Sequence, residues 1–287
     1  MPAQQGAGPD SPPSGAAGQP PGEPLSSGPG SGRLEAVQVR AMFDRIAGVY
    51  DLMNTAMTAG LHHRWRARAA EEARIGPGDR VLDVATGTGD LALELARRVS
   101  PGGEVIGSDF AEAMLARART KAARGGGERV RPRFEWGDAL ELSYADASFA
   151  AATVGFGARN FADLERGLAE MTRVVRPGGR VVVLEITTPT RLPLSLFYRV
   201  WFDRLVPLLG LLAGAIASAT ARVRRRGAET TIADAYTYLP NSVKRFPAPQ
   251  ALAGEMQRAG LQEVRYVLVA GGIVAIHAGT VPPKAPR

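Results

Sequence analysis

The segment VLDVATGTGDLALELARRV, residues 81–99, decides the class of fold that the sequence predicts. Residues 81–85 form a short apolar run typical of a buried strand, and residues 91–99 are predicted to form a helix. Between them, Gly87 and Gly89 let the backbone approach a ligand, and the start of the helix supplies free N–H donors. This order of strand, glycine loop and helix predicts a binding loop in an α/β domain.

The alternation of strands and helices continues after this segment. Further strands are predicted at 104–109, 131–136, 149–154 and 180–187, and helices at 111–124 and 164–175, with a turn at 177–179. Alternation of this kind indicates βαβ crossovers and a parallel sheet that is covered on both faces. A helix ending at Gly260 then precedes strands 263–270 and 273–279, whose two-residue connection permits only antiparallel pairing. We therefore expect an α/β fold with a doubly wound, mostly parallel seven-stranded sheet and an antiparallel C-terminal hairpin.

The ends of the chain differ from this core in composition. Residues 1–32 are rich in proline and glycine with only two charged side chains, so we expect them to be disordered. Residues 33–74 have the apolar spacing of helices and begin the folded domain, which we place at 33–280. An insertion of apolar and then basic residues is predicted around 205–230, and 281–287 are expected to be a loose end.

Composition limits the kinds of chemistry that the chain can perform. The 287 residues include no cysteine and three histidines, which excludes disulfides and a cysteine nucleophile and argues against a metal centre. The absence of cysteine also fits a cytoplasmic protein. The net charge of +7 comes from scattered arginines, so we expect no nucleic-acid partner.

Acidic residues around the glycine loop indicate the type of cofactor. The loop also satisfies the dinucleotide fingerprint, so an NAD-dependent oxidoreductase is an alternative. Against it, Asp83 and Asp90 flank the loop and would weaken the binding of a diphosphate. Asp109, at the end of the second strand, can accept hydrogen bonds from a ribose, and Asp138 can accept one from an adenine amino group. These acids suit S-adenosylmethionine, which carries an ammonium, a sulfonium and a ribose.

Together, DVATGTGD (83–90), SDF (108–110), GDA (137–139) and RVVRPGGRVVVLE (173–185) resemble a class I S-adenosylmethionine-dependent methyltransferase. The segments MFDRIAGVYDLMNTAMTAGLHHRWR (42–66), TVGFGARNF (153–161) and AGGIVAIHAG (270–279) resemble the C-methyltransferases of menaquinone and ubiquinone biosynthesis. The resemblance runs from about residue 39 to residue 279, with an interruption at the insertion. It implies C-methylation of a polyprenylated hydroquinone, either demethylmenaquinol or the benzoquinol equivalent.

The resemblance also implies which residues bind the cofactor. Its contacts fall on Thr88 in the loop, on Asp109 at the ribose and on Asp138 and Ala139 near the adenine. A further contact falls on Gly155, where the family usually has serine, so only the backbone is available here. With the loop itself, the predicted cofactor-binding residues are Asp83, Gly87, Thr88, Gly89, Asp109, Asp138, Ala139 and Gly155.

Three residues are predicted to be catalytic: Arg159, Asn160 and Tyr50. Arg159 is a cation that could stabilise the phenolate of an ionising hydroquinone, whereas a guanidinium is a poor base. A water held by these three residues could carry the proton. His62, His63 and Asp51 are weaker candidates for a direct base.

Each of these predictions has a structural alternative. Arg159 could be a surface residue paired with Asp163, and Asn160 could cap the helix that begins near Asp163. Tyr50 could be a core residue of its helix. His62 and His63 could lie in solvent or pack, and His277 is expected to be structural. A non-catalytic subunit with the same fold is a further alternative at the level of function.

A polyprenylated acceptor implies contact with a bilayer. Residues 205–221 carry no charge and are followed by the basic segment RVRRR at 222–226. We expect this part to be either a helix that covers the substrate or a peripheral membrane contact, and it is short for a transmembrane helix. The sequence leaves the acceptor ring, the tail length and any homo-oligomer undetermined.

Overall fold

The computed structural model describes residues 36–47, 50–124, 130–189, 238 and 241–283. All of them belong to a unit that spans 33–287, apart from a unit at 1–32. The predicted disordered tail and the predicted insertion around 205–230 lie outside the described residues, as do all of residues 190–237 and 239–240 on either side of Tyr238.

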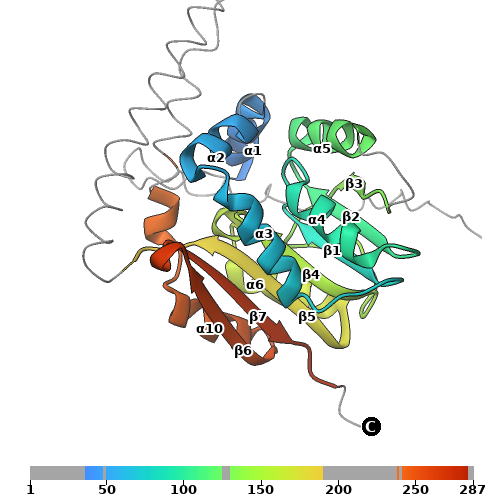
Figure 1. Ribbon diagram of the computed structural model, residues 1–287. Helices are drawn as coiled ribbons and strands as arrows, with labels where there is room; N and C mark the ends of the chain where they lie inside the picture. Colours follow the sequence, from blue (N-terminus) through green and yellow to red (C-terminus); the bar gives the residue numbers. More distant parts are fainter. Residues whose placement is uncertain (1–35, 48–49, 125–129, 190–237, 239–240, 284–287) are drawn as a thin grey trace, which may run out of the picture. The chain divides into compact units, whose positions relative to one another are not determined.

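The described residues form one seven-stranded sheet with the strand order β3-β2-β1-β4-β5-β7-β6 (Figure 1). Strands β1 to β5 pair in parallel, and β7 pairs antiparallel with both β5 and β6. The sheet therefore confirms the predicted fold, including the antiparallel hairpin. The strands are β1 (Arg80–Val84), β2 (Glu104–Asp109), β3 (Arg133–Trp136), β4 (Phe149–Gly155), β5 (Val175–Ile186), β6 (Gln262–Val269) and β7 (Val274–Thr280).

Helices cover both faces of the sheet. One buried cluster contains residues of α3, α4 and α5, and a second contains residues of α6 and α10. Because both faces are covered, the central strands read as continuous apolar runs, such as the fully buried Phe149–Val154 part of β4. The helices are α1 (Ala36–Ile46), α2 (Tyr50–Thr58), α3 (Leu61–Glu72), α4 (Asp90–Val99), α5 (Glu112–Arg124), α6 (Leu164–Val174) and α10 (Pro249–Arg258), with 3₁₀ turns η1 (Ala158–Asn160) and η3 (Ala270–Gly272).

Three local predictions need correction. The helical region 33–74 is divided into α1, α2 and α3, and left-handed backbone at Ala59 (φ 48°) and Gly60 (φ 76°) separates the last two. The predicted turn at 177–179 is a bulge inside β5, where the register with β4 jumps from Val175 to Arg180. Val281, assigned to the loose end, is buried and donates its N–H to the Gly179 carbonyl at 3.0 Å.

The strand order reverses between β1 and β4, because β2 lies on the outer side of β1 and β5 on the outer side of β4. The connections after these two strands therefore leave in opposite directions and open a crevice at their carboxyl ends. Ligands of doubly wound sheets bind at this point. The fold thus places the glycine loop after β1 and the segment after β4 at one site.

Candidate functional site

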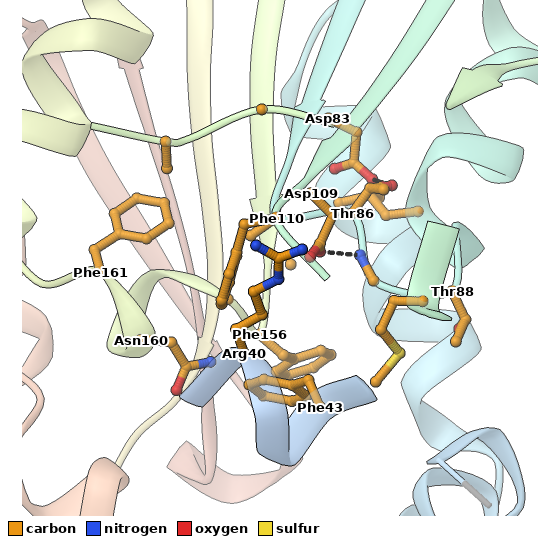
Figure 2. A pocket seen from close by; sticks show the side chains of 18 of the residues that line it. Arg40, Phe43, Asp83, Thr86, Thr88, Asp109, Phe110, Phe156, Asn160 and Phe161 are labelled. Atoms are coloured by element: carbon orange, nitrogen blue, oxygen red, sulfur yellow. Dashed lines mark hydrogen bonds between the residues drawn. The ribbon is translucent and has the colours of Figure 1, made fainter. Parts of the chain in front are cut away.

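A cavity of about 250 Å³ lies at the reversal of strand order. It is lined from the ends of β1, β2, β3 and β4 and from helices α1 and α2 (Figure 2). The structure thereby brings together residues that are far apart in the sequence. Of the predicted cofactor-binding residues, seven line it: Asp83, Gly87, Thr88, Asp109, Asp138, Ala139 and Gly155.

Asp109 fixes the shape of the glycine loop. Its Oδ2 accepts the Gly87 N–H at 2.7 Å and its Oδ1 accepts the Ala111 N–H at 2.9 Å. Burial raises the pKa of Asp109, although these backbone bonds oppose the shift. Gly87 has φ 56°, and a Cβ there would meet no protein atom within 4 Å. A side chain at Gly87 would therefore take up space that belongs to the cavity.

Asp83 is a fully buried carboxylate at the end of β1. Its Oδ1 accepts a hydrogen bond from Thr153 at 2.7 Å, and its Oδ2 accepts one from Thr86 at 2.6 Å. Burial raises the pKa of Asp83 to about 6 against the effect of these hydroxyls. A carboxylate with this pKa changes charge close to neutral pH and is sensitive to a cation in the cavity.

Gly89, predicted with these residues, does not line the cavity. It precedes α4 with φ 83°, and a Cβ there would lie 2.7 Å from the ring of Phe134. Gly89 thus allows the loop to pack against β3. Gly89 therefore belongs to the glycine loop because of packing, and not because it contacts the cavity.

A polar network that the sequence did not indicate anchors α2 to the loop. Thr88 donates to Asp51 Oδ1 at 2.6 Å and accepts from Lys121 Nζ at 2.9 Å. Lys121 also pairs with Asp51 at 2.8 Å and with Asp90 at 2.6 Å. Burial alone would raise the pKa of Asp90, but Arg66 and Lys121 hold it below its ordinary value. Lys121 therefore joins α2, α4, α5 and the loop.

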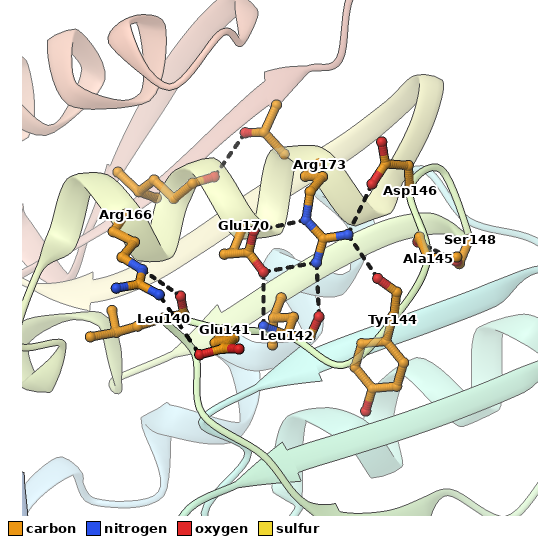
Figure 3. Close-up of polar contacts among 12 residues, drawn as sticks. Leu140, Glu141, Leu142, Tyr144, Ala145, Asp146, Ser148, Arg166, Glu170 and Arg173 are labelled. Carbon is orange, nitrogen blue, oxygen red and sulfur yellow. Dashed lines mark hydrogen bonds and ion pairs between the residues drawn. The ribbon is translucent and has the colours of Figure 1, made fainter. Parts of the chain in front are cut away.

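The segment that carries Asp138 and Ala139 is held from α6 (Figure 3). Arg173 donates to the Leu142 carbonyl at 2.8 Å and to the Tyr144 carbonyl at 2.7 Å. The Glu170 carboxylate accepts the Leu142 N–H at 2.8 Å. Side chains of α6 thus supply the hydrogen bonds that a neighbouring strand would supply in a sheet, and they fix this wall of the cavity.

A second cavity of about 340 Å³ adjoins the first. The two share Phe43, Tyr50, Arg66 and Phe156 as lining residues. The second cavity is mostly apolar, and its wall is built from α1, α2, α3 and the β6–β7 connection. Its apolar lining residues are Met42, Phe43, Ile46, Met57, Ala59, Leu61, Trp65, Phe156, Ile186, Ala270, Ile273 and Val274.

Arg159 lines this second cavity and is not a surface residue. Its side chain is 6% exposed and pairs with Glu185, not with Asp163 as the structural alternative had it. Burial lowers the pKa of Arg159, but Glu185 and the nearby Tyr50 raise it above its ordinary value on balance. Arg159 is therefore a permanent cation beside an apolar space.

Asn160 and Tyr50 lie where the two cavities meet. Asn160 lines the first cavity, and its Oδ1 accepts a hydrogen bond from Tyr238 at 3.1 Å. It does not cap α6, because Asp163 occupies that position and accepts the Arg166 N–H. Tyr50 lines both cavities and packs its ring edge against Phe43. Tyr238, which sequence reasoning missed, lines the second cavity.

The weaker candidates for a base are occupied by other contacts. His62 is buried, its ring nitrogens contact Arg66 and Thr55, and burial with the Arg66 charge lowers its pKa to about 4. His63 is exposed and does not line either cavity. Asp51 is committed to Thr88 and Lys121. Within the described part of the chain, no group of three or more His, Asp or Glu side chains could hold a metal ion.

The chemistry of the first cavity fits S-adenosylmethionine. Asp83 offers a buried negative charge, the open position at Gly87 leaves room for a ligand, and Asp138 lies at the rim. Among the described residues, the basic side chains near the loop, Arg40, Arg66 and Lys121, are paired with carboxylates and are not gathered to bind a diphosphate. The arrangement suits a cationic donor beside an apolar acceptor.

Comparison with known proteins agrees with this chemistry. The chain matches the ubiE/COQ5 methyltransferase family over residues 32–281. It is 47% identical to a demethylmenaquinone methyltransferase of Thermus thermophilus, covering 84% of this chain and 100% of the relative. It is 37% identical to a ubiquinone/menaquinone biosynthesis C-methyltransferase of Teredinibacter turnerae, covering 86% and 92%.

The fold is also found among solved structures. A methyltransferase from Aquifex aeolicus that depends on S-adenosylmethionine aligns with a TM-score of 0.53 at 15% identity, covering 87% of this chain and 100% of the other. These comparisons confirm the resemblance stated above and decide against the dinucleotide alternative. The chain belongs to the ubiE/COQ5 methyltransferase family, and it is a methyltransferase that uses S-adenosylmethionine.

Proposed function

We propose that the protein transfers a methyl group to a ring carbon of a polyprenylated hydroquinone, with demethylmenaquinol as the acceptor. The observation that carries the proposal is the pair of adjoining cavities, one lined by acids and the other apolar with the cation Arg159 in its wall. The first would hold the donor, and the second the acceptor ring and the start of its tail. The benzoquinol precursor of ubiquinone is the second candidate, because it presents the same hydroquinone.

S-adenosylmethionine, when bound, supplies an electrophilic methyl carbon and leaves as the neutral thioether S-adenosylhomocysteine. The residues of this chain then have to make the acceptor nucleophilic. Loss of one hydroxyl proton gives a phenolate, which pushes electron density onto the neighbouring ring carbon. Arg159 stabilises that phenolate, as donors of an oxyanion hole do. After methylation, the ring carbon loses its own proton and the ring becomes aromatic again, while the phenolate oxygen takes a proton back, so that one proton is released in total.

Arg159 does not take these protons, because its pKa lies above its ordinary value. We propose that a water held between Arg159, Asn160 and Tyr50 accepts the proton. Tyr50 lines both cavities, Arg159 the second and Asn160 the first, which supports this assignment. The apolar walls exclude other water and strengthen the electrostatic effect of the guanidinium.

We further propose that the acceptor is taken from a bilayer surface, with residues 205–226 as the peripheral contact. The support is the order of an uncharged segment followed by RVRRR. Leu61 on α3, which lines the second cavity, is exposed, and so is Leu52 on α2. Among the helices that the structure describes, none has the length and apolar character needed to cross a membrane.

Arg159→Gln tests the catalytic site most directly. We expect kcat for a short-chain demethylmenaquinol to fall about 100-fold or more, since an oxyanion donor is lost. Binding of S-adenosylhomocysteine, measured by calorimetry, should change less than about twofold. Arg180→Gln, at a buried arginine in the middle of β5 that lines neither cavity, is the matched control. Wild-type turnover in Arg159→Gln would contradict the proposed role of this residue.

Lys121→Met tests the network that anchors α2. The variant leaves Asp51 and Asp90 without their shared cation, so the loop at Thr88 loses its support. We expect about tenfold weaker binding of S-adenosylhomocysteine, the effect of losing one charged hydrogen bond. Lys244→Met, a lysine that does not line either cavity, is the control. Equal affinity in the two variants would show that Lys121 plays no part in cofactor binding.

The pH dependence of cofactor binding tests Asp83. Its pKa of about 6 means that it gains negative charge as the pH rises from 5 to 7. The ligand carries an ammonium group, so its binding favours the ionised form of Asp83 and lowers the pKa of this carboxyl. We therefore expect the affinity to rise between pH 5 and 7, by about tenfold for each unit by which binding lowers that pKa. Asp83→Asn should flatten the profile, and Asp146→Asn should not. The same slope in wild type and Asp83→Asn would assign the titration to another group.

Deletion of residues 214–228 tests the membrane contact. We expect the whole chain to sediment with vesicles that contain anionic lipid, and the added salt to weaken this binding. The deletion variant should lose most of it, while binding of S-adenosylhomocysteine shows that the variant is folded. Unchanged sedimentation would exclude this segment as the contact.

A further inference from the structure

Glu185 is a carboxylate inside the apolar strand β5, next to the second cavity. Its side chain is 2% exposed and makes three hydrogen bonds. Oε1 accepts from Arg159 Nη1 at 2.5 Å and from the Ile186 N–H at 2.9 Å. Oε2 accepts from the backbone N–H of Arg159 at 3.2 Å. One carboxylate therefore holds both the main chain and the side chain of Arg159.

This arrangement leaves part of the guanidinium uncommitted. Arg159 Nε is buried and has no hydrogen-bond partner in the part of the chain that the structure describes. A buried donor without a partner is unfavourable, so its place beside a cavity points to an acceptor on a ligand. Glu185 occupies one terminal nitrogen and leaves the other donors for that acceptor.

Glu185 also determines the net charge beside the proposed acceptor site. A lone buried guanidinium is costly, and the carboxylate compensates it. The other titratable or charged side chains that line the second cavity are Tyr50 from α2, His62 and Arg66 from α3, and Tyr238. His62 is neutral near neutral pH, because burial and the Arg66 charge lower its pKa to about 4. Burial raises the pKa of Tyr238, so it stays neutral as well. Among the residues that the structure describes, Glu185 is the carboxylate that forms an ion pair with Arg159.

We propose that Glu185 is the positioning residue of the methyl-transfer site, which aims Arg159 at the acceptor oxygen and moderates its charge. The inference rests on the proposed function, because it assumes that Arg159 stabilises a phenolate. Glu185 does not line either cavity, so it acts through Arg159. Without its charge, Arg159 would favour the phenolate more strongly but would no longer be held in one geometry.

A double-mutant cycle with Glu185→Gln and Arg159→Gln tests this proposal. We expect Glu185→Gln alone to lower kcat about 10- to 100-fold, with KM and S-adenosylhomocysteine binding within about twofold. The acidic limb of its pH–rate profile should move to lower pH by about one unit. In the Arg159→Gln background, the same substitution should lower kcat less than about twofold further. Glu72→Gln, at a buried carboxylate paired with Arg265, is the matched control.

The outcomes separate the inference from the proposed function. If Arg159→Gln keeps full turnover, the proposed function of the site fails. If Arg159→Gln loses turnover but Glu185→Gln keeps it with an unshifted profile, only the inference fails. An equal loss from Glu185→Gln in both backgrounds would show a purely structural role and would also overturn it. If Glu185→Gln does not fold, Glu185→Asp replaces it: a lower kcat with an unshifted acidic limb supports the inference, and wild-type kcat contradicts it.

Discussion

The reversal of strand order between β1 and β4 is the constraint on which the rest of the structure depends. It opens the crevice at the carboxyl ends of these strands, and each strand delivers a different part of the site there. The end of β1 supplies Asp83 and the glycine loop, and the end of β4 supplies Gly155 and then Arg159. The cavities that we propose for the donor and the acceptor are thereby adjacent, although no local sequence pattern joins them.

Buried charges around this crevice are stable because each one has partners. Asp83 is held by two threonine hydroxyls, Asp109 by two backbone N–H groups, and Arg159 by Glu185. Lys121 neutralises two carboxylates at once and ties α2 to the loop. Since an unpaired buried charge is costly, the site keeps its geometry before any ligand arrives. Arg159 Nε has no hydrogen-bond partner among the described residues, and Arg159 lines the second cavity, where the proposed acceptor would add its own group.

Much of the fold and part of the site could be predicted from the sequence. The strands are apolar runs of the right length, and acids at strand ends follow from the local pattern. The sequence therefore places Asp83, Asp109 and Asp138 at the carboxyl ends of strands, and all three line the first cavity. Lys121, Glu185 and Tyr238 were missed, because each acts through a residue far away in the sequence. Glu185 stands out in the sequence as a carboxylate within an otherwise apolar strand (VVVLEI), and this pattern could have identified it as a candidate. The break at Ala59 and Gly60 was missed since helical spacing continues across it.

We propose that this site methylates a hydroquinone whose ionised hydroxyl is stabilised by Arg159. The most direct measurement compares methyl transfer from labelled S-adenosylmethionine to the reduced and the oxidised forms of one short-chain demethylmenaquinone, with the product identified by mass spectrometry. The account predicts a ring-methylated product from the reduced form and none from the quinone, which has no hydroxyl to ionise. Equal transfer to both forms, or no transfer to the reduced form, would contradict it.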